Sequence, residues 1–148
     1  MASFFEHRVA RGALRYLEPG ESVYGAMSAA LRGRTQQVAG AFAVGSTQTG
    51  NSRAAAAAAG LVLPDSQTIG VVVSNRRLLF LELAIGARVK ALTSSVPLTD
   101  VQSIEVRRLG LGGTTTITVR SVQIQFEGRV GMGRELAAGL AAARGQPE

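Results

Sequence analysis

The alternation of apolar and polar residues is clearest in the middle of the chain. Two runs rich in Val, Leu and Ile, residues 69–73 and 78–83, flank a polar break at Ser74, Asn75 and Arg76. Asn favours a tight turn because it tolerates positive φ and its side chain bonds the local backbone. The pattern predicts an antiparallel hairpin whose two strands both press into a core.

Several further strands are predicted where short apolar runs alternate with turn residues. On one of them, Gln102, Ile104, Val106 and Arg108 share a side, which is predicted to face the core. Pro97 lacks the amide hydrogen that a sheet ladder needs, so we expect it at a sheet edge or a strand end. The predicted strands besides the hairpin cover residues 22–31, 89–98, 101–108, 114–119 and 122–127, with a break at Gly86 and a glycine turn at 109–113.

An amphipathic helix is predicted over residues 3–17. Its apolar residues recur every three or four positions, and a set of arginines lies on another side. Gly12 is its predicted weak point, because Gly is a poor helix former. The apolar set is Phe5, Val9, Ala13, Tyr16 and Leu17, and the basic set is Arg8, Arg11 and Arg15.

A second amphipathic helix is predicted over about residues 133–144, after glycines at 128–133 break the sheet pattern. Its apolar face needs a partner, and a barrel with one mouth plugged by the helix supplies one while leaving few free strand edges. The residues at helical spacing are Met132, Leu136, Leu140 and Ala143.

The predicted fold class is mainly β. We expect a bent antiparallel barrel of about seven strands, capped by the C-terminal helix, with an extra helix at the N-terminus. Strand alternation predicts a closed, dry centre. The side chains predicted to point into it are Val71, Val73, Leu79, Ile104, Ile117 and Ile124.

One domain accounts for the length of 148 residues. The helix at residues 1–17 precedes a domain that covers residues 18–148. Residues 33–60, rich in Gly, Ala, Ser, Thr and Gln, interrupt that domain and are expected to form a long, partly mobile insertion. Within it, consecutive alanines predict a helix over residues 53–59 that Gly60 ends.

The composition removes several kinds of chemistry. The chain has no Cys, which excludes disulfides and thiol catalysis and fits a reducing cytoplasm. Its net charge of +6 comes almost entirely from arginine, since Lys90 is the only lysine. We expect neither a signal peptide nor a transmembrane segment, because no apolar run has the required length and continuity.

No residue pattern predicts catalysis or a cofactor. His7 is the only histidine, and a metal site or a base–nucleophile pair needs partners that the chain lacks. Asp100 is predicted to bond the amides of its own turn. Gly128, Gly131 and Gly133 precede a helix, as in a phosphate-binding loop, but the dinucleotide spacing fails and no Walker lysine follows. We therefore expect no enzyme, no cofactor and no metal.

Three segments, in order, resemble the bacterial pleckstrin-homology-like (PH-like) domains. They are residues 17–21 (LEPGE), 73–80 (VSNRRLLF) and 96–106 (VPLTDVQSIEV). In that family a turn of the form Thr/Ser-Asp/Asn-Arg-Arg-Leu is followed by an Ile/Val-Pro-Leu-x-Asp-Val/Ile segment that leads into the next strand. Residues 135–137 (ELA) also match a domain ending seen there.

The resemblance covers residues 17–32 and 61–144. The insertion at residues 33–60 departs from the plain pattern and is similar to a variant seen in proteins from GC-rich actinobacteria. The resemblance implies a seven-stranded bent barrel capped by one helix. It also implies a binding or assembly module without enzymatic activity.

Arginine pairs near the predicted turns are the candidate contact residues for an anion or a partner. Through the resemblance, the loop after the first strand corresponds to the loop with which eukaryotic relatives hold phosphoinositide headgroups. Here that loop contributes two arginines around Gly33. The candidates are Arg32, Arg34, Arg76, Arg77, Arg107 and Arg108, with Arg88 and Lys90 on the segment between the last two pairs.

Two hypotheses for the function follow. In the first, the chain acts through contacts with an unidentified protein partner, or with a second copy of itself. In the second, it binds an anionic lipid surface through its arginines and through the N-terminal helix, which has Phe4 and Phe5 at its start. Both place it in the cytoplasm, the second at the membrane periphery. Nucleic acid is not expected, because stacking aromatics are few and no binding motif is present.

Overall fold

A computed structural model of the chain describes residues 4–31, 54–64, 68–109 and 112–145. The expected insertion falls mostly outside these residues, as do Arg32 and Arg34. Its last part is described: residues 54–58 are helical, and Gly60 follows with a φ of 82°. The prediction of a helix in the alanine run, ended by Gly60, is therefore confirmed.

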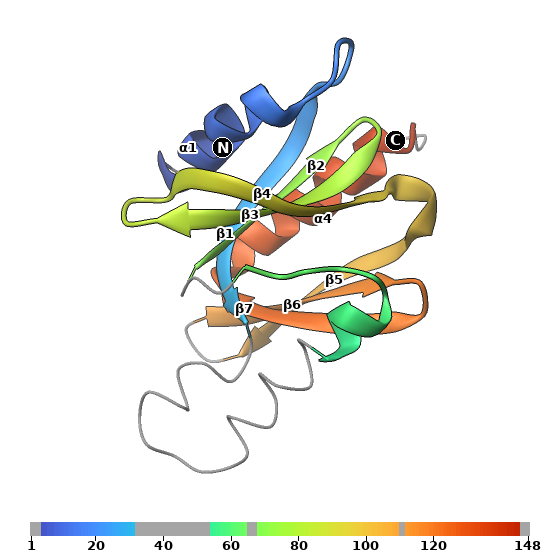
Figure 1. The fold of residues 1–148 in the computed structure, drawn as a ribbon. Coiled ribbons are helices and arrows are strands. Elements are labelled where there is room, and N and C mark those ends of the chain that lie inside the picture. Colours follow the sequence, from blue (N-terminus) through green and yellow to red (C-terminus); the bar gives the residue numbers. More distant parts are fainter. Residues whose placement is uncertain (1–3, 32–53, 65–67, 110–111, 146–148) are drawn as a thin grey trace.

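Seven antiparallel strands form one bent sheet in the order β4-β3-β2-β1-β7-β6-β5 (Figure 1). The predicted fold class is confirmed, and so are the two hairpin turns, at Asn75–Arg76 and at Arg120–Ser121. Arg120 and Ser121 both take positive φ, as a two-residue hairpin turn that matches the strand twist requires. The strands are β1 (Val23–Leu31), β2 (Ile69–Ser74), β3 (Arg77–Ala84), β4 (Arg88–Pro97), β5 (Val101–Leu109), β6 (Gly112–Val119) and β7 (Val122–Gly128).

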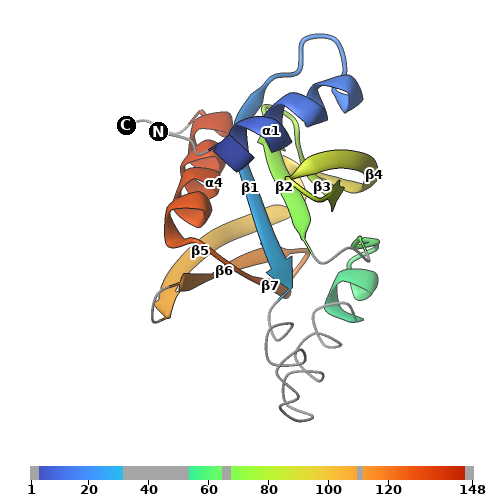
Figure 2. The same ribbon diagram turned by 90° about the vertical axis from the view of Figure 1, so that its left-hand side faces the viewer.

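Strand β1 belongs to both halves of the sheet. Its residues from Val23 to Ala29 pair with β2, and Ala30 and Leu31 pair with β7 (Figure 2). Strands β4 and β5 are the two ends of this order, so the hydrogen-bonded ladder stays open between them, where a closed centre was predicted. Pro97 lies at the end of edge strand β4, as predicted.

Helix α4 (Val130–Ala143) packs on the inner face of the bent sheet, mainly against β1 and β5 (Figure 2). Leu136 and Leu140 join Val71, Val73 and Phe80 in the larger hydrophobic cluster. Phe80 and Phe126 stack there with ring centroids 6.3 Å apart, which links the two halves of the sheet. The predicted capping of the sheet by the terminal helix is confirmed.

Strand β2 is buried on both faces, and so is most of β3. Helix α1 (Phe4–Ala13) covers the outer face, where Val9 and Ala13 contact a second cluster that includes Val72 and Leu79. Leu79 was predicted to point into the centre, and it lies under α1 instead. The prediction failed because a strand covered on both faces loses the apolar–polar alternation that identifies its inner side.

The inward face of β5 and the start of α4 also differ from the sequence prediction. The register of β5 against β6 shifts between Val101 and Ser103, so Val101 and Ile104 are buried while the predicted inward residue Gln102 is exposed. Helix α4 begins at Val130, so of the glycines predicted to break the pattern, Gly128 ends β7 and Gly131 and Gly133 belong to the start of α4. A short 3-10 turn, Leu14–Tyr16, extends α1, and another, Leu98–Asp100, connects β4 to β5.

Residues 59–63 connect edge strand β4 to the β6–β7 turn. The Val62 amide donates to Ser94 Oγ on β4, which donates back to the Val62 carbonyl, and Arg120 at the β6–β7 turn donates to the Ala59 carbonyl. The side chains of Ala56, Ala59, Leu61 and Leu63 are buried in the larger cluster. The end of the insertion is therefore part of the core.

Candidate functional site

The arginines at the β2–β3 turn are held by carboxylates. Arg76 pairs with Glu18 at 3.3 Å. Arg77 pairs with Glu21, with 3.0 Å between Nε and Oε2, and donates to the Tyr16 carbonyl at 2.7 Å. Arg77 is mostly buried and the Glu21 side chain is fully buried. This cluster fastens the entry of β1 to the β2–β3 turn, which leaves Arg77 little capacity for a ligand.

Burial by itself raises the pKa of Glu21, but the hydrogen bonds outweigh it. Arg77, the Ser74 hydroxyl and the Glu18 amide all donate to the carboxylate, and the positive charge of Arg77 adds to their effect. Together they lower the pKa from 4.5 to about 2. Such a carboxylate is a weak proton acceptor at neutral pH and has a structural role.

The other predicted pair, Arg107 and Arg108, is exposed near the end of β5, opposite Thr114 and Gly113. The start of β5 lies near the β2–β3 turn, because the amide of Leu98, just before β5, donates to the Arg76 carbonyl. Arg107 lies six residues farther along the extended strand, roughly 20 Å from this turn. The predicted patch is thus divided between two ends of the sheet.

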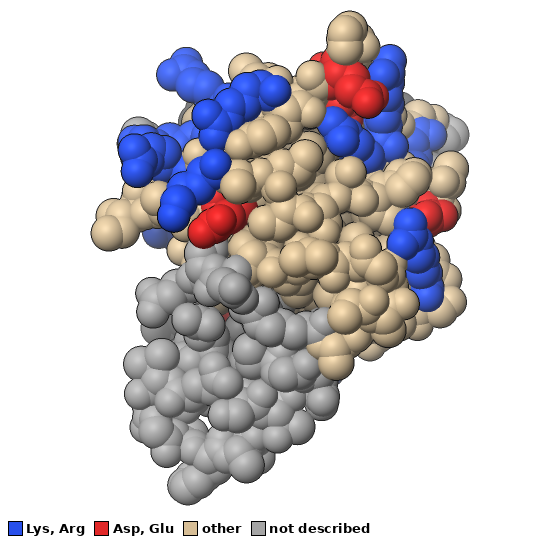
Figure 3. All heavy atoms as spheres, viewed as in Figure 1, with Lys and Arg blue, Asp and Glu red and all other residues tan. Residues whose placement is uncertain are grey.

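A different set of cations comes together between α1 and β4. They line a groove of about 790 Å³, which we call the α1–β4 groove. Figure 3 shows these blue side chains gathered over α1 and the adjacent end of the β3–β4 hairpin. Its lining consists of Arg8, Arg11, Gly12 and Arg15 from the N-terminal helix and Arg88, Val89 and Lys90 from β4.

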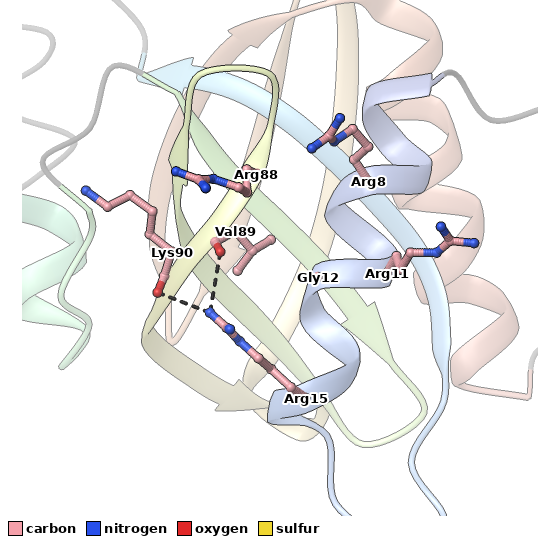
Figure 4. Close-up of a pocket in the computed structure, with 7 residues that line it drawn as sticks. All are labelled: Arg8, Arg11, Gly12, Arg15, Arg88, Val89 and Lys90. Atoms are coloured by element: carbon pink, nitrogen blue, oxygen red, sulfur yellow. Dashed lines mark hydrogen bonds between the residues drawn. The ribbon is translucent and has the colours of Figure 1, made fainter.

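Gly12 and Val89 form the floor of the groove. A Cβ atom at position 12 would lie 2.6 Å from Val89 Cγ2, so only a glycine lets the helix come this close to β4. The sequence suggested Gly12 as a weak point of the helix, and the structure shows that it is the contact point. Alternation along β4 directs Val89 toward α1 and leaves Arg88 and Lys90 exposed (Figure 4).

Neutral acceptors, not carboxylates, hold Arg15 across the groove. Its guanidinium donates to the carbonyls of Val89 at 3.4 Å and Lys90 at 3.3 Å (Figure 4). It also donates to the Tyr16 hydroxyl at 2.8 Å. These bonds give two carbonyl groups of edge strand β4 a hydrogen-bond donor, but they do not neutralise the charge of Arg15.

Among the described side chains, Glu82 pairs with a cation of the groove. Lys90 Nζ lies 3.6 Å from Glu82 Oε2 in a partly exposed ion pair. Within the described part of the chain, Arg11 and Arg88 have no hydrogen-bond or ion-pair partner. The groove therefore keeps an excess of positive charge that is available to an anion.

The residues considered for catalysis stay apart. His7 is exposed on α1. The Asp100 carboxylate accepts from Arg120 at 2.9 and 3.0 Å, so its predicted bonds to the amides of its own turn are not made. Gly131 and Gly133 lie inside α4, so these glycines are part of a helix and not of a loop. Among the described residues, no three His, Asp or Glu side chains gather to hold a metal ion.

No family model matches the chain, and no curated protein matches it in sequence. Of the helices within the described ranges, none has the length and apolarity needed to cross a bilayer. The PH-like resemblance therefore rests on the three motifs. The sequence analysis missed that the arginines of the first helix meet Arg88 and Lys90, because it grouped Arg88 and Lys90 with the arginine pairs of the turns and considered the helix separately.

Proposed function

We propose that the protein is a non-enzymatic binding module of PH-like fold that contacts an anionic surface through the α1–β4 groove. The strand order, the shared strand β1 and the terminal helix against the inner face support the PH-like part, since the resemblance implies this arrangement. Glu18, Glu21 and Asp100 are each engaged by an arginine, which supports the non-enzymatic part.

The observation that carries the proposal is the convergence of five cations from two distant segments on one groove. Arg11 and Arg88 are exposed, and the bonds of Arg15 leave its charge uncompensated. A cationic surface of this kind accelerates and favours the association of an anionic partner. It repels the same surface of a second copy, so the proposal gives the groove a partner other than itself.

Solution NMR with poly-L-glutamate as a soluble anionic probe tests this proposal. Amide shifts are expected to concentrate on α1 and the start of β4, and to weaken as salt screens the charges. The double variant Arg11→Gln/Arg88→Gln is expected to reduce the affinity about 30-fold, because each cation near an anionic surface contributes ~1 kcal/mol. Arg107→Gln/Arg108→Gln is the matched control, because it removes the same charge from another exposed pair.

Equal losses in the two double variants would show that binding follows net charge and not the groove, and would overturn the proposal. Shifts centred on the end of β5 would do the same and would restore the patch predicted from the sequence. Urea unfolding of each variant, with unchanged midpoints, ensures that the comparison concerns folded protein.

A further inference from the structure

We propose that the anionic surface is a lipid bilayer and that Ile85, at the tip of the β3–β4 hairpin, inserts into it while the α1–β4 groove holds the headgroups. This inference rests on the proposed function, because it names the partner of the same groove. It adds an apolar anchor that charge alone does not imply.

The turn presents Ile85 to solvent. The Ala87 amide donates to the Ala84 carbonyl at 3.1 Å, which closes a tight turn around Ile85 and Gly86. Gly86 and Ala87 take positive φ, 78° and 62°. The Ile85 side chain is 100% exposed, more than any other large apolar side chain in the described part of the chain.

The fold gives no reason for an isoleucine at this position. Turns favour Gly, Asn, Asp and Pro, whose backbone preferences suit the bend, and Ile is β-branched and apolar. A single exposed apolar residue is ordinary on a protein surface. Its position beside the groove is what distinguishes Ile85.

The cations lie directly behind this tip. Arg88 is paired with Ala84 across the turn, and Lys90 follows two residues later, about 7 Å farther along the strand. The headgroup layer of a bilayer is roughly 5–8 Å thick on each side of the hydrocarbon. With Ile85 at the level of the acyl chains, Arg88 and Lys90 therefore lie at the depth of the phosphates.

A bilayer suits this arrangement better than a folded acidic protein. A fully exposed side chain on a projecting turn needs a deep, matching pocket on a protein partner, whereas a fluid bilayer accepts it without one. Arginine and lysine next to an apolar anchor are the combination that binds anionic interfaces. An acidic protein partner is the alternative outcome of the test.

Co-sedimentation of the full chain with vesicles provides the first measurement. Vesicles of phosphatidylcholine mixed with phosphatidylglycerol are expected to bind the protein in a salt-sensitive manner, and vesicles of phosphatidylcholine alone are not. Ile85→Ser is expected to lower binding to the anionic vesicles roughly tenfold. Val62→Ser is the matched control, because Val62 is also an exposed aliphatic residue, 66% accessible, and lies near Ser94 toward the other end of β4.

The second measurement reports insertion directly. The chain has no tryptophan, so Ile85→Trp introduces a single fluorophore at the tip. Its emission is expected to shift to the blue on anionic vesicles and to be quenched by lipids brominated on the acyl chains. Val62→Trp is expected to show neither change. Both positions are exposed, so unaltered urea midpoints are expected for all four variants.

The outcomes separate the inference from the proposed function. Binding to anionic vesicles through the groove, without quenching of the tryptophan in Ile85→Trp, would overturn insertion and leave the proposed function standing. Groove-dependent binding of poly-L-glutamate without any vesicle binding would point to an acidic protein and also overturn the inference. If the groove binds neither anionic vesicles nor poly-L-glutamate, both the inference and the proposed function are overturned.

Discussion

Gly139 of α4 lies directly against Gly25 of β1, main chain to main chain. A Cβ atom at position 139 would stand 2.7 Å from the Tyr24 carbonyl oxygen and 2.9 Å from Gly25 Cα. A Cβ at position 25 would in turn lie 3.0 Å from the Glu135 carbonyl oxygen. This crossing sets the distance between the terminal helix and the strand that both halves of the sheet share.

Gly139→Ala is therefore expected to destabilise the protein by about 1–3 kcal/mol, the usual cost of overpacking, because the obstructing atoms belong to the backbone and cannot rotate away. Urea unfolding measures the change. Gly131→Ala is the control: it lies in the same helix with open space around it, and is expected to leave stability unchanged or raise it by up to about 1 kcal/mol. A stable Gly139→Ala variant would show that the crossing is looser than described.

The second prediction concerns pH. The pKa of Glu21 is lowered from 4.5 in the unfolded chain to about 2 in the fold, so its contribution to stability is present above pH 4.5 and is lost as the pH falls toward 2. The shift corresponds to about 3 kcal/mol. The free energy of unfolding, followed by urea titration between these pH values, is expected to fall by that amount more in the wild type than in Glu21→Gln.

In Glu21→Gln this part of the acid sensitivity is expected to be absent, at the cost of lower stability at neutral pH, because Arg77 loses the charge of its partner. Parallel pH profiles of the wild type and the variant would contradict the role assigned to Glu21.

The third prediction concerns the floor of the α1–β4 groove. Gly12→Ala alone is expected to lower stability by about 1 kcal/mol, because the clash with the stiff Val89 side chain outweighs the gain in helix propensity. In a Val89→Ala background the same change has room, and is expected to stabilise by up to about 1 kcal/mol. A double-mutant cycle in urea measures this reversal of sign, and additive effects would argue against the contact.

The fourth prediction concerns residues 59–63, which connect edge strand β4 to the β6–β7 turn. Arg120→Asn keeps a residue that tolerates positive φ but removes the guanidinium that contacts Asp100 and the Ala59 carbonyl. Hydrogen exchange of the Leu61 amide, which donates to the Ala56 carbonyl, is expected to accelerate more than that of amides in α1. Equal acceleration everywhere would indicate global destabilisation instead.

Local patterns were sufficient for most of the elements. The turn at Asn75, the turn at Arg120 and the stripe of Leu136 and Leu140 were predictable because turn chemistry and helical periodicity act between residues that are near in sequence. The side on which Leu79 is buried was not predictable, since the helix that covers it lies some seventy residues earlier. The bulge at the start of β5, which exposes Gln102, likewise depends on the partner strand.

The candidate site shows the same division. The sequence by itself determined the elements, the positive charge and the two separate sets of cations, on the first helix and on β4, because composition and periodicity are properties of short segments. Only the tertiary structure decided that Gly12 meets Val89, that these cations share one groove beside Ile85, and that Arg77 is instead held by Glu21. The reason is physical: a side chain's electrostatic environment is set by neighbours within several ångströms, and here those neighbours come from segments more than fifty residues apart.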